Sequence, residues 1–222
     1  MRSRSMTGAR AAVDRNRVYR RVAAWQTAHG GPADRRSERR TDDRLTAFEL
    51  GAAGLQDDLE LEAVLVTGVA SEVAARNLEL SAAHLRHVDL SGARLPRMHL
   101  RNCRVSGGDL ANVMVRAGVA ERCAFENVRL TGGTWQDGTL RDVSFRGCRI
   151  DLASFAASRL ERVLFEDCTL AQADLQDARL SAVVLVDCDL RGVDLTGARL
   201  SAGCELRGCV LDGARNVAST ST

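Results

Sequence analysis

A five-residue period of large apolar side chains runs from Leu80 to Leu200, and it limits the fold more than any other feature of the sequence. Every position divisible by five in this stretch carries Leu, Ile, Val, Phe or Trp, except Ala120. The position two residues earlier carries Ala, Val, Cys, Gly or Ser, except at Leu78 and Met98. A pattern this regular indicates an internal repeat, which must be interpreted before local propensities.

Neither a helix nor a flat strand fits this period. Five residues advance about 500° around an α-helix, so the large residues would scatter around its circumference. In a strand, an odd step sends each successive large residue to the opposite face. The repeat therefore predicts a bend two residues after each large residue. That position holds turn-forming residues in many units, namely Gly92, Gly107, Gly132, Gly147, Gly192, Gly197, Asn102, Asn112, Asn127, Asp137, Asp142, Asp167, Asp177 and Asp187, but Ala117, Leu152 and Ala157 in others.

Four bends of about 90° would close a square coil of 20 residues, with coils stacked about 4.8 Å apart. Residues 20 apart would then form columns, of which three are Phe125, Phe145 and Phe165; Cys148, Cys168 and Cys188; and Val143, Val163 and Val183. After Leu200 the period slips by one, which an extra residue near Gly203 explains. With that slip, Cys209 continues the column of Cys188, and Cys204 continues that of Val183.

Several units resemble the A-[DN]-L-x-x motif of the pentapeptide-repeat family, for example Ala173-Asp174-Leu175, Val193-Asp194-Leu195 and Cys188-Asp189-Leu190. The resemblance covers residues 58–213 and implies a right-handed quadrilateral β-helix. The expected fold class is therefore an all-β solenoid with a short N-terminal extension, either helical or disordered.

The N-terminal extension differs in charge from the rest of the chain. Residues 1–44 hold 12 Arg and 5 acidic residues, whereas the remaining residues hold 19 Arg and 24 acidic residues. Residues 9–29 predict a helix with Val18, Val22 and Trp25 on one stripe, followed by a charged linker. This stretch is interpreted as a capping or surface helix, as disordered chain, or as a basic amphipathic helix for an acidic partner, a membrane surface or nucleic acid.

Residues 45–57 would open or cap the solenoid, residues 58–213 would form it, and residues 214–222 would be a polar tail. Leu50, Leu55 and Leu65 keep the five-residue phase, as does Leu45, while Glu60 interrupts it. Alternatively, residues 45–55 form a helix that caps the open end. No helix follows the last coil, and relatives in the family can pair through their C-terminal ends. A homodimer through the C-terminal coil, or a frayed last coil, is therefore expected.

The candidate chemical groups favour structural roles. All seven cysteines occupy the small inward position, where they are expected to be buried thiols. Stacking near 5 Å does not exclude disulfides, but no C-x-x-C pair exists and no His lies among the cysteines, which argues against a metal site. His84, His87 and His99 fall at outward positions and are expected to be solvated.

No catalytic or nucleotide-binding motif appears, and a straight prism offers no cleft that excludes water. The chain is therefore expected not to be an enzyme and to use no cofactor. It holds no apolar run of 18 residues and no N-terminal signal region, so a cytoplasmic location is expected.

Three groups of outward residues form the candidate interaction surface: Arg159, Arg179 and Arg199 with Arg162; Asp174 and Asp194; and Leu164, Val184 and Val186. Stacked arginines repel one another unless acids such as Glu161, Asp142 and Asp177 offset them. The Leu and Val residues would form a small exposed apolar patch.

These surfaces predict a scaffold or interaction protein that presents a rigid rod to an unknown protein partner. The alternative, implied by the family, is a DNA mimic that binds DNA gyrase and protects it from quinolones. A third interpretation is nucleic-acid binding by the arginine-rich N-terminus and the arginine surface.

Overall fold

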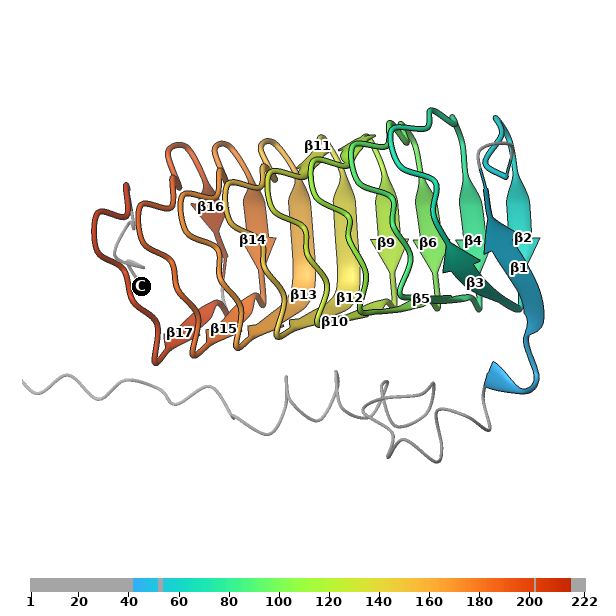
Figure 1. Cartoon of the computed structure of the whole chain (residues 1–222). Coiled ribbons are helices and arrows are strands. Elements are labelled where there is room, and N and C mark those ends of the chain that lie inside the picture. Colours follow the sequence, from blue (N-terminus) through green and yellow to red (C-terminus); the bar gives the residue numbers. More distant parts are fainter. Residues whose placement is uncertain (1–41, 52–53, 202, 217–222) are drawn as a thin grey trace, which may run out of the picture.

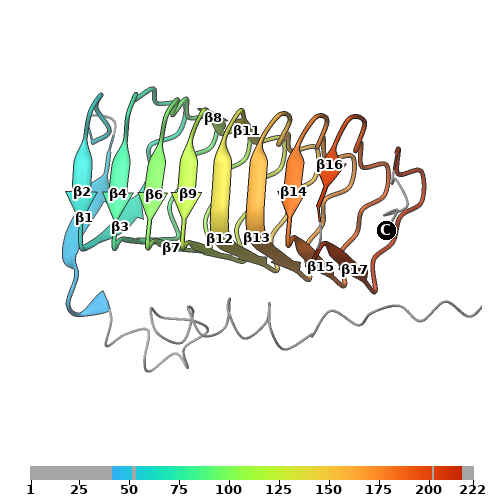
Figure 2. The same cartoon turned by 180° about the vertical axis from the view of Figure 1, so that it is seen from behind.

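The computed structural model describes residues 42–51, 54–201 and 203–216, which form a four-sided parallel β-solenoid (Figure 1). The coils wind in a right-handed sense and stack along one axis (Figures 1 and 2). The predicted all-β solenoid is confirmed, whereas the helix predicted for residues 9–29 lies outside the described residues.

The four sides are called faces 1 to 4, in the order in which the chain visits them. Face 1 carries β2 (Glu60–Glu62), β4 (Glu79–Ser81), β6 (His99–Arg101), β9 (Val119–Glu121), β14 (Arg179–Ser181), β16 (Arg199–Leu200) and the first parts of β12 (Thr139–Arg146) and β13 (Arg159–Glu166). Face 2 carries β1 (Thr46–Leu50), β3 (Val64–Gly68), β5 (His84–Arg86), β7 (Arg104–Ser106), β10 (Ala124–Glu126), β15 (Val184–Val186), β17 (Glu205–Arg207) and the remainder of β12 and β13. Strands β12 and β13 turn the corner and join both faces into one 15-stranded sheet.

Faces 3 and 4 contain shorter pairings. On face 4, β8 (Met114–Arg116) and β11 (Thr134–Gln136) form a two-stranded sheet. Elsewhere on these faces the coils meet through single parallel bridges, such as Asp89 with Asp109 on face 3 and Asp174 with Asp194 on face 4.

The 20-residue spacing is the register of the central coils. Phe125 pairs with Phe145, and Phe145 with Phe165. Their rings stack with centroids 4.8 and 4.9 Å apart and interplanar angles of 16° and 6°. The predicted column is thus confirmed, and the large and small inward residues together form one continuous core.

The predicted bends are confirmed as well. The residue two positions after each large central residue has a left-handed backbone, for example Gly92 (φ 67°) and Asn102 (φ 54°). Leu152 (φ 58°) and Ala157 (φ 56°) adopt the same conformation, although neither favours it. The coil geometry therefore imposes the bend regardless of which residue occupies the corner.

The first coils depart from the predicted phase. Leu61 pairs with Leu80, and Val66 pairs with Leu85, so the inward positions are Leu61 and Val66. Leu65 pairs with outward His84, and its assignment as a central residue is wrong. Between Val66 and Ala70 this coil has one residue fewer than the next coil, because Val66 pairs with Leu85 but Val69 pairs with Asp89. As a result Glu60 takes an outward position, where a charge is solvated.

Both ends of the solenoid extend beyond the expected limits. Strand β1 pairs with β3, so parallel pairing begins at Thr46, and a helical cap is wrong for this segment. At the other end, Leu185 pairs with Leu206, which confirms the one-residue slip. The last described bridge joins Asp194 to Arg215.

Candidate interaction surfaces

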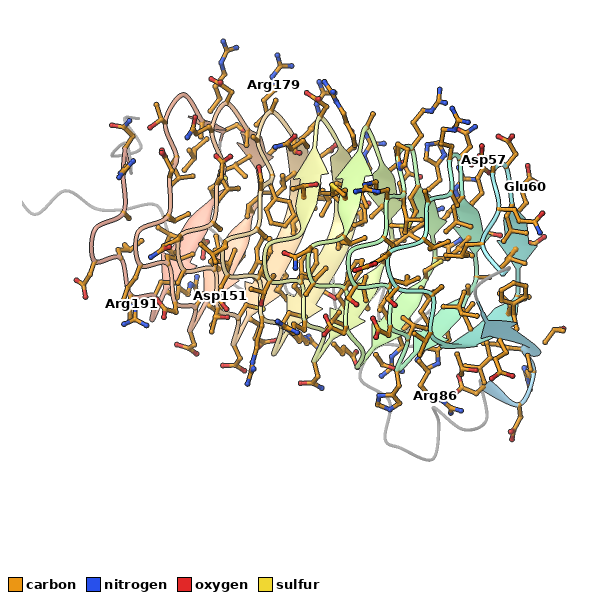
Figure 3. All side chains as sticks on the ribbon, turned by 45° about the horizontal axis from the view of Figure 1, so that its top comes forward. Asp57, Glu60, Arg86, Asp151, Arg179 and Arg191 are labelled. Carbon is orange, nitrogen blue, oxygen red and sulfur yellow. The ribbon has the colours of Figure 1, made fainter. Side chains whose placement is uncertain are left out.

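Arg159, Arg179 and Arg199 form one column on face 1, in strands β13, β14 and β16. All three are exposed, and Figure 3 shows Arg179 projecting away from the ribbon. Among the described residues, none of them lies within ion-pair distance of a carboxylate. Thr139 occupies the same column one coil earlier. The predicted stack of like charges is therefore present.

Two of the three acids expected to offset this column, Glu161 and Asp142, pair with other arginines, and Asp177 makes no ion pair with a described residue. Arg162 lies at the corner after face 1 and contacts Asp142, with Nε 2.5 Å from Oδ1 and Nη2 3.0 Å from Oδ2. Glu161 accepts hydrogen bonds from Arg162 and, at 3.0 Å, from Arg141 Nε. Hydrogen bonding from Arg162 lowers the pKa of Glu161, and Asp142 raises the pKa of Arg162. Arg162 is thus part of a neutralised cluster rather than of the free column.

Asp174 and Asp194 lie side by side on face 4, where they brace the backbone. Asp194 Oδ1 accepts hydrogen bonds from the Thr196 backbone N at 2.9 Å and from its hydroxyl at 2.6 Å. Asp174 accepts similar bonds from the Gln176 backbone N at 2.9 Å and from Ser154 Oγ at 3.0 Å. The Thr196 hydroxyl is the main cause that lowers the pKa of Asp194.

The same Asx-turn occurs on face 3, where Asp89 accepts bonds from Ser91 and Asp189 from Arg191. The Asp of the repeat motif therefore caps a turn, and this role explains why it recurs. This role of the Asp was not predicted from the sequence, although the Asp-Leu-Ser and Asp-Leu-Thr triplets signal it.

Leu164 and Val184 pair across adjacent coils on face 2, as expected, and Val186 packs against them. The expectation that they form an exposed patch is wrong. Leu164 and Val184 are buried, and Val186 is half-buried. They make up an apolar cluster separate from the main core.

His84 also lies outward on face 2, but the expectation that it is solvated is wrong. Its Nδ1 lies 2.6 Å from Asp42 Oδ1, and its Nε2 lies 2.6 Å from Ser106 Oγ. Asp42 contacts Arg86 Nη1 as well, at 3.1 Å. These contacts bury the imidazole and tie the start of the described chain to face 2.

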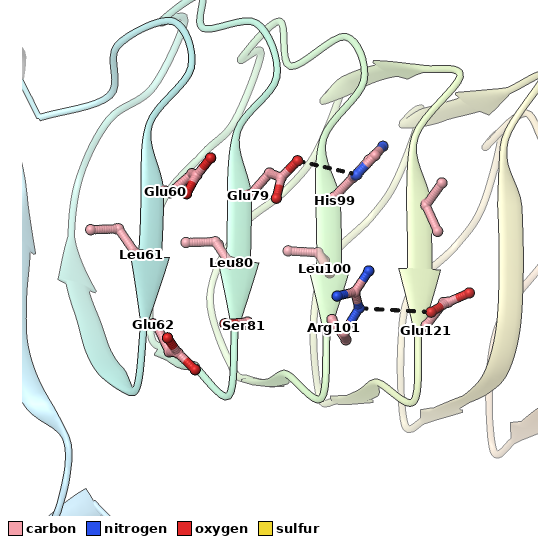
Figure 4. A pocket seen from close by; sticks show the side chains of 11 residues that line it. Glu60, Leu61, Glu62, Glu79, Leu80, Ser81, His99, Leu100, Arg101 and Glu121 are labelled. Atoms are coloured by element: carbon pink, nitrogen blue, oxygen red, sulfur yellow. Dashed lines mark ion pairs between the residues drawn. The ribbon is translucent and has the colours of Figure 1, made fainter.

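A shallow hollow of about 320 Å³ lies on face 1 over strands β2, β4, β6 and β9 (Figure 4). Glu79 faces His99 at 3.6 Å, and Arg101 faces Glu121 at 3.8 Å, across neighbouring strands. Both pairs are largely solvated, so they contribute little to stability. Nothing in this lining forms a nucleophile with a neighbouring base.

The cysteines line the interior. Five of them are buried, and Cys204 and Cys209 are half-buried near the C-terminal end. Six of the seven thiols donate to a backbone carbonyl of the preceding coil, as Cys103 Sγ does to Leu80 O at 3.2 Å, whereas Cys188 Sγ donates to Val186 O of its own coil. Contact with the Cys148 thiol raises the pKa of Cys168 to about 12. No group of three metal-ligating side chains occurs among the described residues.

Within the part of the chain that the structure describes, no helix has the length and apolarity to cross a membrane.

Two family models match the sequence. One, described as a pentapeptide repeat region, matches residues 119–195, and the other, described as eight copies of pentapeptide repeats, matches residues 79–113. Together they span half of the 222 residues. No curated protein matches the sequence.

Solved structures with a similar arrangement include other pentapeptide-repeat proteins. A trypsin-treated variant of QnrB1, a plasmid-mediated fluoroquinolone resistance protein, is 14% identical over 76% of this chain and 92% of its own, with a TM-score of 0.34. HetL from Nostoc sp. strain PCC 7120, involved in heterocyst differentiation regulation, is 20% identical over 78% of this chain and 89% of its own, with a TM-score of 0.26. Rfr23 from the cyanobacterium Cyanothece 51142 is 16% identical over 65% of this chain and 91% of its own, with a TM-score of 0.24. Similarity at this level carries no information about a partner.

Proposed function

The chain belongs to the pentapeptide-repeat family, and from that premise we propose that it is a non-catalytic interaction protein of the cytoplasm. It presents a rigid rod to a protein partner, and the contact surface is the arginine column of face 1. The observation that carries this proposal is that Arg159, Arg179 and Arg199 stack without a described counter-charge.

Such a column is costly in isolation. The backbone positions of successive arginines in the column are about 4.8 Å apart. Like charges directly opposite each other on adjacent strands destabilise a sheet. Many arginines elsewhere on the rod are paired with acids, as Arg129 is with Asp109 at 2.8 Å, although Arg94, Arg97 and Arg149 make no ion pair with a described residue. An acidic surface on the partner would supply the missing charges, and the rod would hold the three arginines at a fixed spacing.

The test is capture of cytosolic proteins from the native host on the immobilised full chain. We expect a protein that is retained by the wild type and released by salt. It should be lost from the triple variant Arg159→Thr, Arg179→Thr, Arg199→Thr. Threonine suits this column because Thr139 already occupies it. The matched control is Arg149→Thr on face 3, where Thr169 follows Arg149 in the column.

Equal retention by the triple variant and the wild type would refute the contact surface. If the immobilised chain retained DNA but no protein, and this retention depended on salt and on the three arginines, the nucleic-acid interpretation would be favoured instead.

DNA mimicry at gyrase is the alternative, and the charge of the rod fits it less well. Duplex DNA carries one negative charge per about 1.7 Å, so a rod of roughly eight coils, about 37 Å long, would need about 20 net negative charges. Residues 45–222 carry 24 acids against 19 arginines. A gyrase supercoiling assay with micromolar protein decides the matter, because an absence of inhibition or quinolone protection excludes mimicry.

A further inference from the structure

The outward residues that open the strands of face 1 form one unbroken column along the rod, which we call the charge column. Each member pairs with the next across parallel strands, and Figure 2 shows those strands in a single row from β2 to β16. The column begins with Glu60 and Glu79, continues through His99, Val119 and Thr139, and ends with Arg159, Arg179 and Arg199. Its acids and its arginines therefore lie at opposite ends of the rod.

The second outward column of face 1 is arranged differently. There Arg101 and Arg141 alternate with Glu121 and Glu161 on adjacent strands. Glu121 lies 3.8 Å from each of the two arginines, and Arg141 Nε lies 3.0 Å from Glu161 Oε2. Opposite charges on neighbouring strands attract, so this column neutralises itself within the chain. The charge column does not.

The two ends of the charge column are too far apart to neutralise each other within one chain. Seven coil steps separate Glu60 from Arg199, which is about 34 Å at strand spacing. The two glutamates and the three arginines are all exposed. Among the described residues, Glu60 has no cation within ion-pair distance, and Glu79 faces only His99, at 3.6 Å. Both ends are therefore available to a partner.

The charge column is complementary to itself when a second copy is turned around. A twofold axis can cross face 1 between Val119 and Thr139, perpendicular to the rod and in the plane of contact. It sets the column of one copy against the same column of the other in reverse order, so each contact occurs twice. The residues brought opposite each other are Glu60 and Arg199, Glu79 and Arg179, His99 and Arg159, and Val119 and Thr139.

The second outward column remains complementary under the same rotation. Arg101 of each copy comes to lie opposite Glu161 of the other, and Glu121 opposite Arg141. No two carboxylates and no two guanidinium groups are then opposed anywhere on face 1. With the two rods parallel, the rotation would exchange the columns and set Glu60 against Glu62, and like charges repel. Charge therefore selects the antiparallel arrangement.

The shape of face 1 agrees with its charge. Glu60 and Glu79 line the shallow hollow of about 320 Å³ over strands β2, β4, β6 and β9 (Figure 4). At the other end of the face, Arg179 projects away from the ribbon (Figure 3). In the antiparallel arrangement, the projecting arginines of each copy enter the hollow of the other.

The contact area indicates a weak association. Eight strands at strand spacing and three residues per strand make face 1 about 37 Å by about 10 Å, so roughly 400 Å² of each copy faces the other. A standard stable interface buries about 800 Å² per partner. Ion pairs at exposed positions are weakened by salt. Pairing through face 1 therefore requires a high protein concentration or low salt, and it uses a different surface from stacking through the C-terminal coils.

We propose that the partner of the arginine column is a second copy of this chain, paired antiparallel through face 1. This inference rests on the function proposed above and names the partner of the same surface. Each rod supplies Glu60 and Glu79 as the counter-charges that the arginines of the other rod lack among their own coils.

Two reciprocal charge exchanges test the pairing. The acid-exchanged variant carries Glu60→Arg with Glu79→Arg, and the arginine-exchanged variant carries Arg179→Glu with Arg199→Glu. All four positions are exposed, so the circular dichroism should not change. Sedimentation velocity at sub-millimolar concentration compares about 0.01 M salt, where the Debye length is about 30 Å, with about 1 M salt, where it is about 3 Å.

The weight-average mass of the wild type should be at least about 1.5-fold higher in the low salt, because ion pairs are screened in the high salt. Each variant alone should show no such rise, since its copies would oppose like charges. An equimolar mixture of the two variants should restore the rise, because each exchanged residue then faces the opposite charge. The fourfold variant with both exchanges should restore it as well, and it keeps the net charge of the wild type.

The matched control is Arg94→Glu with Arg149→Glu, which lie exposed on faces 4 and 3. It changes the net charge by as much as the arginine exchange does, and it should keep the wild-type rise. The proposal is overturned if the mixture of folded variants is no heavier than either variant alone, or if the mass of the wild type does not depend on salt.

The acid-exchanged variant separates this inference from the function on which it rests, because it keeps all three arginines of the column. Suppose that a different host protein is captured by the wild type and by this variant, but not by the triple threonine variant. If the wild type also fails to self-associate, the proposed function stands and the second copy is excluded as its partner.

Discussion

At the scale of single residues, each corner demands a left-handed backbone whichever amino acid occupies it. Asn112 and Gly132 occupy successive corners of one column, and both accept this conformation readily. Leu152, next in that column, does not, and it exposes 57% of its surface. This residue therefore stores strain without a compensating contact in the core.

Replacing Leu152 with Asn should stabilise the fold. The left-handed conformation costs an L-residue about 1–2 kcal/mol, and Asn relieves part of that cost through its short polar side chain. We expect the free energy of unfolding to rise by about 1 kcal/mol in urea denaturation. Leu152→Ala, which removes the leucine side chain but keeps the strain, should change it by less than half as much. An equal gain from Ala would show that loss of the leucine, rather than relief of strain, is responsible.

A second residue-scale prediction concerns Gly138, which leaves room for Trp135. A Cβ added at Gly138 would lie 2.4 Å from Trp135 Cδ1 and 3.0 Å from Gly118 O, and the indole is buried. Gly138→Ala should therefore destabilise the protein by about 1–3 kcal/mol through overpacking. Gly51→Ala, where a Cβ meets nothing within 4 Å, is the control and should be nearly neutral. Calorimetry of both variants measures the difference.

At the scale of the repeat unit, the Asp of the motif accepts a hydrogen bond from the backbone N–H two residues later and so stabilises the turn, as Asp89 and Asp194 do. Hydrogen bonds from the Ser91 hydroxyl lower the pKa of Asp89, and those from Thr196 lower the pKa of Asp194. Arg191 lowers the pKa of Asp189 in the same way. These carboxylates bind protons less readily in the folded state than in the unfolded state, so acid favours unfolding.

The thermal midpoint should therefore stay level between about pH 7 and pH 5 and fall below about pH 4. The stabilisation is present above the unfolded-state pKa of about 3.9 and is lost as the pH drops through the lower folded-state pKa. The variant Ser91→Ala with Thr196→Ala, which keeps the carboxylates but removes their hydroxyl donors, should lose less stability in acid. An unchanged acid profile in this variant would contradict the assignment.

At the scale of the whole molecule, the two ends of the rod differ. At the N-terminal end, β1 closes the first coil against β3. At the C-terminal end, the last coil exposes Leu206, Val210 and Leu211 among the described residues. An open coil end presents apolar side chains and unpaired strand groups, so it favours association with a second end.

We therefore predict a homodimer that stacks through the C-terminal coils. Sedimentation velocity at micromolar concentration should show twice the chain mass of 24.0 kDa. Leu206→Arg with Leu211→Arg should yield a monomer with unchanged circular dichroism. The control Val69→Arg alters an exposed apolar residue far from this end and should remain dimeric. A wild-type monomer would refute the prediction.

The sequence by itself determined the square coil, its 20-residue register, the corner positions and the slip near Gly203. It could do so because the large residue and the small residue two positions earlier must both point inward in every five-residue unit. With an odd period, they can do so only if the backbone bends once in each unit. The Phe125, Phe145 and Phe165 column follows from that spacing alone.

Only the tertiary structure decided which outward residues are solvated and which charges are paired. Local pattern treats Leu164, His84 and Arg179 alike, because each lies one residue from an inward centre. Their burial depends on which side chains pack against them, as Asp42 and Ser106 do against His84 and Val184 does against Leu164. The pairing of Arg162 with Asp142 likewise depends on which side chains neighbouring coils bring together. The shortened step between Val66 and Ala70 could not be predicted from the sequence either. Leu65 and Val66 are both apolar, and only the pairing with the next coil shows that Val66 is the inward residue.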